Sequence, residues 1–243
     1  MCFFNGDTYL FLFDFHVHTV RGSSDSSLTT EEMIAECQNV GLDGVCLTEH
    51  SGGWTKESIE SEFHDSGLLV IGAIEINTNI GHVIAIGIQE YTTGINDIEI
   101  LRRTVDAQGG VLIAAHPLRN FFNKPPYNQN LLYKDWKVTP KTMKEAASHE
   151  LFSIVDLIEI ANGSNTEEEN IFAGQIADFL EKGGTGGSDA HSVEGIGNSV
   201  TVFQDDVEDT DDLIEKLRLG SFYPAQGLNK KNLKRFRWDG TQG

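Results

Sequence analysis

The sequence has few cysteines and no long apolar run. Its three cysteines, Cys2, Cys37 and Cys46, form no CxxC pair, which excludes a disulfide framework and a cysteine-based zinc site. No stretch reaches the ~18 consecutive apolar residues of a membrane span, and the apolar N-terminus lacks the basic residues of a signal peptide. These absences predict a cytoplasmic protein with no membrane partner.

Basic residues are also scarce, at 18 Lys and Arg against 37 Asp and Glu, for a net charge of −19. Nucleic-acid binding draws most of its affinity from Lys and Arg, so this balance disfavours a general polyanion binder. It leaves room for a local site whose positive charge comes from metal ions.

The C-terminal segment 229–238 is a basic exception to this acidic balance. Its five cations are Lys230, Lys231, Lys234, Arg235 and Arg237. Such a tail is more often solvated or in contact with another subunit. It could also steer an anionic substrate or touch nucleic acid, with Phe236 or Trp238 as stacking rings. We therefore keep nucleic acid as the less favoured partner.

Strand and helix patterns alternate along the 243 residues, a length that suits one domain spanning 1–243. Strands are expected at 9–18, 43–50, 68–77, 82–88, 111–117, 156–163, 184–192 and 199–203, and helices at 28–41, 54–67, 96–110, 167–183 and 209–220. This order predicts an α/β fold with a mostly parallel sheet, and the number of strands favours a barrel. The weakly patterned segment 118–150 is expected to be a long loop with a short helix, forming a lid or insertion.

Histidines and carboxylates gather where these strands end. His16 and His18 are one residue apart in a strand and should point the same way. Because the carboxyl ends of parallel barrel strands share one face, we expect a set of ligand-type side chains to converge there. The set is His16, His18, Asp25, His50, Glu75, His82, His116, Asp189 and His191. Imidazoles with carboxylates and no cysteine suit zinc, manganese or iron. His64 and His149 fall outside the pattern and are expected to be solvated.

The order of the short motifs HVHT, SDSS, TEH, a Glu after a strand, GH, AHP and SDAH resembles the PHP (polymerase and histidinol phosphatase) family of metal-dependent phosphoesterases. The resemblance runs from Asp14 to Phe203. It implies a distorted (β/α)7 barrel that holds three divalent metal ions. It places the first metal on His16, His18, Glu75 and Asp189, the second on Glu75, His82 and His116, and the third on Asp25, His50 and His191. Glu49 and Asp14 would then orient imidazoles from behind.

This resemblance implies hydrolysis of a phosphate ester by a metal-activated hydroxide, with Glu75, Asp189 and His191 as the catalytic residues. Arg21 and Arg119 leave strand ends and are expected to bind phosphate. Glu159 and Asn162 are expected on the substrate side or behind the ligands. The favoured function is a phosphomonoesterase acting on a small phosphorylated metabolite, of histidinol phosphate or nucleotide type.

Three other functions remain open. A phosphodiesterase or exonuclease is supported only by the basic tail. An amidohydrolase typically bridges its metals with a carboxylated lysine, and no lysine lies at a predicted strand end. A non-catalytic regulatory PHP module should have lost ligands, whereas every expected ligand position is filled.

Overall fold

The computed structural model describes residues 4–5, 8–52, 54–88, 92–124, 126 and 130–238. The strands are β1 (Phe4–Asn5), β2 (Thr8–Tyr9), β3 (Phe11–Val17), β4 (Gly44–Glu49), β5 (Leu69–Thr78), β6 (Gly81–Ile86), β7 (Val111–Ala114), β8 (Leu157–Asn162), β9 (Gly184–Gly187), β10 (Ser199–Phe203), β11 (Phe222–Gln226) and β12 (Lys234–Arg235). The helices are α1 (Thr30–Val40), α2 (Lys56–Phe63), α3 (Ile98–Ala107), α4 (Met143–Ala146), α5 (Leu151–Ile154), α6 (Glu167–Phe179), α7 (Thr210–Leu219) and a short 3-10 turn at Val193–Gly195.

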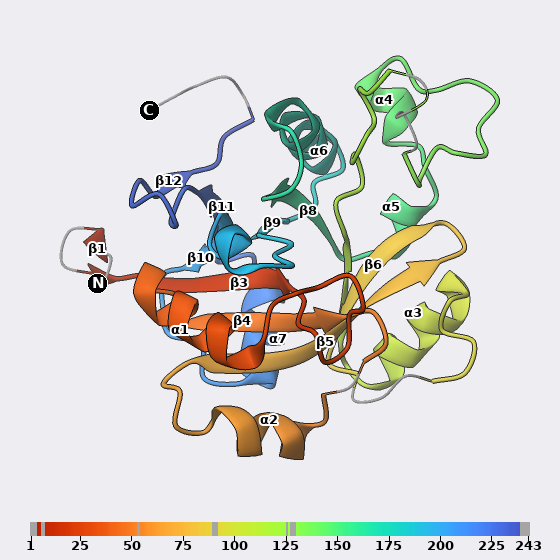
Figure 1. Ribbon diagram of the computed structural model, residues 1–243. Helices are drawn as coiled ribbons and strands as arrows, with labels where there is room; N and C mark the ends of the chain where they lie inside the picture. Colours follow the sequence, from red (N-terminus) through yellow and green to blue (C-terminus); the bar gives the residue numbers. More distant parts are fainter. Residues whose placement is uncertain are drawn as a thin grey trace.

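One curled sheet organises the fold. Its strand order is β12-β11-β10-β3-β4-β5-β6-β7-β8-β9, and helices surround it (Figure 1). Its two flanks approach each other just after β9, where Ala190 pairs in parallel with Val17 and the His18 amide donates to the Ala190 carbonyl over 2.9 Å. The expected distorted, TIM-like α/β fold is confirmed.

The sheet is mixed, which corrects the expectation of a mostly parallel one. β3, β4, β5, β7, β8 and β9 point the same way, but β6 runs antiparallel to both of its neighbours. β10 and β12 are also reversed. The cause of the first reversal is a tight hairpin, since only Asn79 and Ile80 separate β5 from β6. A parallel connection would need a crossover of a dozen or more residues.

Strand β3 is buried along its whole length and carries the first histidine pair into the centre of the molecule. Phe13 and Phe15 lie ring to ring at 4.8 Å in a cluster that also contains Leu213 and Leu217 of α7. Simple alternation along the strand would place Val17 beside these phenylalanines, but it packs in a separate cluster. The pairing of β3 with β4 shifts register between Asp14 and Val17, and such an irregularity redirects side chains.

All five expected helices are present. The Thr29–Glu32 capping box begins α1, and Gly41 ends it in the left-handed conformation, as the sequence indicates. A second capping box, Thr166 with Glu169, begins α6. No helix among the described residues is long and apolar enough to cross a membrane.

The segment 118–150 is turn-rich and contains α4, and lies at the upper right of Figure 1. The prediction that His149 is solvated is wrong, because only 6% of it is exposed. Its ring stacks on Trp136 at 5.7 Å and meets Tyr133 edge-on. This aromatic cluster ties the two halves of the segment together. His64 is solvated as expected, with 66% of its side chain exposed.

The basic tail folds back on the sheet. β12 pairs with β11, and the Arg235 guanidinium lies 4.6 Å from the centre of the Tyr223 ring. Phe236 is buried, so it presents no ring for base stacking. The cationic side chains of the tail remain exposed.

Candidate metal centre

The first histidine pair is held with one nitrogen of each ring facing the site. His16 Nδ1 lies 2.9 Å from Glu159 Oε1, and His18 Nδ1 lies 3.0 Å from Ser23 Oγ. A carboxylate can only accept, so His16 carries its proton on Nδ1. Both Nε2 atoms are buried, and no hydrogen-bond partner for them exists among the described residues. Two such orphaned nitrogens would be costly without a further ligand.

Glu75 of β5 is the hub of the site and is only 2% exposed. Its Oε1 lies 2.8 Å from His116 Nε2 and 2.9 Å from His82 Nδ1. Its Oε2 lies 3.3 to 3.5 Å from ring nitrogens of His16, His18 and His50. One carboxylate therefore faces both halves of the site, as a bridging ligand must.

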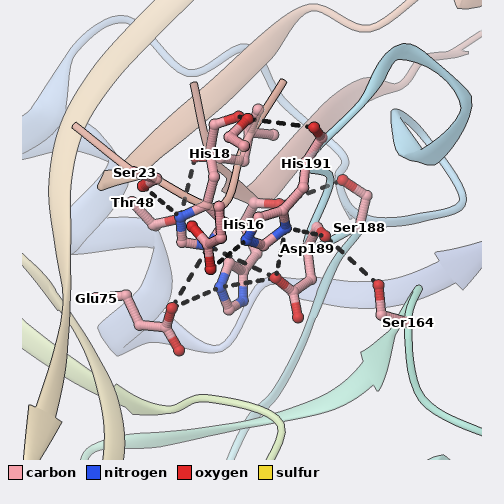
Figure 2. Close-up of polar contacts among 12 residues, drawn as sticks. His16, His18, Ser23, Thr48, Glu75, Ser164, Ser188, Asp189 and His191 are labelled. Atoms are coloured by element: carbon pink, nitrogen blue, oxygen red, sulfur yellow. Dashed lines mark hydrogen bonds and ion pairs between the residues drawn. The ribbon is translucent and has the colours of Figure 1, made fainter. Parts of the chain in front are cut away.

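Four groups of ligand atoms lie close enough to hold a metal ion, each within 4.8 Å. They are His16–His18–Glu75, His16–His116–Asp189, Glu75–His82–His116 and His18–His50–His191. The third group is the predicted second metal site. The first two share the residues predicted for the first metal, and His116 joins them. Figure 2 shows His16 and His18 lying between Glu75 and Asp189.

Asp25 and His191 complete the outer side of the site. Asp25 Oδ2 lies 3.4 Å from His50 Nε2 and 3.5 Å from His191 Nε2. His191 Nδ1 lies 3.1 Å from the Asp189 carbonyl oxygen, which fixes the proton there and leaves Nε2 facing Asp25. Asp25, His50 and His191 are the residues predicted for the third metal. The group of ligand atoms within 4.8 Å there is His18–His50–His191, and 57% of the Asp25 side chain is exposed.

The donor set fits divalent cations. His16 and His18 combine a buried unpartnered Nε2 with an opposite nitrogen held by an oxygen, the arrangement that orients metal-binding imidazoles. All nine predicted ligands meet in one place, including His82 from the reversed strand β6, since Asn77 pairs with His82 near the end of β5.

Comparison with known proteins agrees with this geometry. The family model "PHP domain" matches residues 14–173, and a second model, "PHP-associated", matches residues 167–222. The chain belongs to the PHP domain family. No curated protein matches the chain. PHP domains bind divalent metals, and the phosphoesterases of the family depend on them.

Solved structures share the fold of this PHP domain at low identity. A two-domain protein from Bacteroides vulgatus containing a predicted PHP-like metal-dependent phosphoesterase is 20% identical with a TM-score of 0.62, covering 88% of this chain and 64% of that one. The lesion-specific endonuclease EndoQ from Pyrococcus furiosus is 16% identical with a TM-score of 0.56, covering 86% and 56%. An amidohydrolase from Chromobacterium violaceum is 15% identical with a TM-score of 0.53, covering 74% and 87%.

Neighbouring groups keep two buried carboxylates of the PHP site ionised. Burial favours the neutral form of Glu75, but His16 and the hydrogen bonds of His116 and His82 outweigh it and hold its pKa well below the usual value. Asp189 behaves alike: burial opposes its charge, yet His16, His18 and Arg119 hold its pKa well below normal. Two buried carboxylates that stay ionised create the negative potential that attracts cations.

Glu49 and Asp14 orient the site through other groups. Glu49 accepts from the Thr19 amide, Ser23 Oγ and Trp54 Nε1, so it reaches His18 only by way of Ser23. Asp14 was expected to bond an imidazole, which is wrong. Its carboxylate accepts from the backbone amides of His16, Ser188 and Gly197, and burial raises its pKa to about 6. It therefore fixes the backbone of the first and last ligand segments.

Ser23 is a positioning residue that the sequence analysis did not identify, although the serines around Asp25 were noted. Its Oγ donates to Glu49 Oε2 over 2.6 Å, so it must accept from His18 Nδ1 and from the His50 amide at 3.2 Å. Figure 2 shows Ser23 beside the His18 ring. The hydroxyl therefore sets the proton of His18 on Nδ1 and leaves Nε2 free to bind metal.

Ser23→Ala should lower the affinity for the tightest-bound metal by about 10-fold to 100-fold, the usual effect of losing an orienting partner. Chelator competition measures it. Ser27→Ala on the same loop is the matched control, because the exposed Ser27 hydroxyl donates to the His191 backbone carbonyl and not to a ring nitrogen. Equal affinities in the two variants would contradict this role for Ser23.

The predicted substrate residues differ in their placement. Arg119 is 32% exposed at its side chain and bonds Asp189 and Asn162. Glu159 and Asn162 are buried. Glu159 Oε2 accepts from the His116 amide over 2.7 Å and from Asn162 Nδ2 over 2.9 Å. These contacts favour an orienting role for Glu159 and Asn162 over direct substrate contact.

Arg21 lies away from this network. Its guanidinium sits 4.0 Å from the centre of the Trp54 ring, on an exposed loop after β3. The Trp54 indole in turn donates to Glu49. Arg21 is therefore linked to the ligand shell through Trp54, and its role in phosphate binding stays a prediction.

Proposed function

We propose that this PHP domain is a metal-dependent phosphomonoesterase that hydrolyses a small phosphorylated metabolite. The observation that carries the proposal is the pair of buried, unpartnered Nε2 atoms of His16 and His18, facing the carboxylates of Glu75 and Asp189 at 3.4 to 3.5 Å. Three divalent ions, of zinc, manganese or iron, are proposed. Their sites are the three that the sequence analysis assigns: His16, His18, Glu75 and Asp189; Glu75, His82 and His116; and Asp25, His50 and His191.

Bound divalent metals would lower the pKa of a water molecule and neutralise charge on phosphoryl oxygens. The residues of this chain supply the rest. Glu75 would hold the metals of both inner sites, and Asp189 and His191 would hold those of the inner and the outer site. Glu159 and Ser23 keep the proton of each imidazole on Nδ1, so that Nε2 could bind metal. Arg119 presents its guanidinium at the partly exposed edge of Asp189, where it would bind phosphate oxygens.

A diesterase acting on nucleic acid is the second candidate. Its support is the fold likeness to an endonuclease and the exposed cations of the tail. The acidic net charge of −19 opposes it, and the burial of Phe236 removes one stacking ring.

An amidohydrolase is less well supported. Glu75, rather than a lysine, faces both halves of the site. The Nζ of Lys182, two residues before β9, donates to the Val155 carbonyl, two residues before β8. Val155 and Lys182 therefore both lie at the end of the sheet opposite the metal ligands.

A panel of esters separates these functions. Purified protein, with zinc, manganese or iron added in turn, should hydrolyse p-nitrophenyl phosphate about 100-fold or more faster than bis-p-nitrophenyl phosphate, because a single terminal phosphate matches a site with one nearby guanidinium. A labelled oligonucleotide should remain intact. Preferred cleavage of the diester or the oligonucleotide would instead favour the nuclease, and bound metals without any hydrolysis would favour a regulatory module.

A further inference from the structure

A cavity of about 190 Å³ opens beside the second predicted metal site. His82, His116 and Arg119 line it together with Leu131 and Leu132. The first three residues belong to the ligand shell or contact it. The two leucines come from the turn-rich segment that follows, so the cavity lies between the metal centre and this segment.

Asn130 holds the wall of the cavity in place. Its Nδ2 donates to the Pro117 and Arg119 carbonyls at 2.8 and 2.9 Å, and its Oδ1 accepts from the Leu132 and Tyr133 amides at 3.1 and 3.2 Å. All hydrogen-bonding capacity of this buried amide is used within the protein. The leucine wall is therefore fixed to the backbone that carries Arg119, and the cavity is preformed.

The aromatic cluster of the segment supports this wall from behind. Tyr133 Oη donates to the Ala146 carbonyl over 2.8 Å, and Tyr133 and Trp136 both contact the His149 ring. Leu132 lies against Gly81, the residue before His82, where an added Cβ would come within 2.8 Å of it. The position of Leu132 is thus set on two sides.

The lining of the cavity combines the polar side chains of His82, His116 and Arg119 with the apolar side chains of Leu131 and Leu132. A phosphate held by Arg119 and the metal site would direct its ester oxygen and leaving group toward the leucines. We propose that this cavity is the subsite for the leaving group of the substrate, and that Leu131 and Leu132 select a compact apolar group no larger than one ring. This proposal rests on the proposed phosphoesterase function.

The size of the cavity limits the substrate class. A dry protein cavity of about 150 Å³ accepts benzene, so 190 Å³ holds one ring with a short substituent. Such a group matches this volume more closely than a nucleoside, which joins a base to a sugar. The substrate class is therefore a phosphomonoester of a single-ring or short-chain alcohol.

The test uses the metal-loaded full chain and measures both binding and turnover. Binding of methylphosphonate and phenylphosphonate is measured by calorimetry, and hydrolysis of methyl, phenyl and 1-naphthyl phosphate by phosphate release. Leu131→Trp fills the cavity and Leu131→Ala enlarges it. Leu131 is 39% exposed, so both variants should fold, which melting temperatures check. Val138→Ala, an apolar residue of the same segment that is 66% exposed, is the matched control.

The wild type should bind phenylphosphonate at least about 10-fold more tightly than methylphosphonate, as expected for a fitted apolar contact. Leu131→Trp should remove this preference, because it should weaken the binding of phenylphosphonate more than that of methylphosphonate. Leu131→Ala should raise the relative rate on the naphthyl ester, and Val138→Ala should change nothing.

Equal ratios in the wild type and both Leu131 variants would overturn the subsite, even if esters are hydrolysed. A ratio that depends on Leu131 without hydrolysis of any ester would keep the subsite and overturn the proposed phosphoesterase function. If neither phosphonate bound, both the subsite and the proposed phosphoesterase function would be overturned.

Discussion

Glu75→Gln should lower kcat/KM for p-nitrophenyl phosphate by about 1,000-fold or more, equivalent to ~4 kcal/mol of transition-state stabilisation. The substitution keeps the shape of the side chain and removes its charge. Oxygens of Glu75 face ring nitrogens of His16, His18, His50, His82 and His116. The amide has one acceptor oxygen, so it cannot ligate metals on both sides. Metal content, measured on the same samples by atomic emission, should fall with the activity.

Glu60→Gln provides the matched control. Glu60 lies exposed on α2, so the same chemical change there should alter neither metal content nor turnover. If Glu75→Gln kept both the wild-type metal content and the wild-type rate, Glu75 would not be the bridge, and the assignment of the two inner sites would be wrong.

The ligand set was predictable because it follows from strand ends. His16, His50, His116 and Asp189 each come at or just after the end of a strand that points toward the site, and the period of two in β3 places His16 and His18 together. His82 reaches the site in a different way from the other ligands. It begins a strand rather than ending one, and it reaches the site because β6 is reversed.

Other features depend on contacts that no local pattern shows. Ser23 and Glu159 act through partners that are distant in the chain, Glu49 for one and His16 for the other. The aromatic cluster around His149 is made by residues in a segment without regular periodicity. Strand β11 contains Pro224, which argues against a strand in sequence analysis, yet it pairs with β10 along its length.

The packing of Val17 in the same cluster as Leu12 is another feature that the local sequence pattern does not predict. Simple alternation places Val17 with Phe13 and Phe15. The register of β3 against β4 shifts between Asp14 and Val17, in the stretch that contains His16. Irregular strands of this kind often lie next to active sites, and their position depends on the neighbouring strand.

Glu159→Gln should reduce the affinity for metal at the His16 site by about 100-fold or more, at the upper end of the effect of orienting residues. Glu159 Oε2 receives two donors, the His116 amide and Asn162 Nδ2, so the amide oxygen of glutamine must occupy that position. The amide NH2 then faces His16 Nδ1 and can only donate to it. His16 must move its proton to Nε2, the nitrogen that would bind metal.

The backbone geometry should survive this change, which makes the tautomer of His16 the measured quantity. Burial opposes the charge of His16, but Asp189, Glu159 and Glu75 outweigh it and raise its pKa well above the usual value, so the spectra are recorded at a pH alkaline enough to neutralise the ring. Long-range ¹H–¹⁵N NMR spectra of the metal-free protein should then show the His16 proton on Nδ1 in the wild type and on Nε2 in Glu159→Gln. Glu169→Gln is the matched control, because Glu169 is also buried but bonds the Thr166 amide in a capping box where glutamine serves equally well. An unchanged His16 tautomer together with weakened metal binding would mean that Glu159 acts through its charge. An unchanged tautomer with unchanged metal affinity would remove Glu159 from the metal centre.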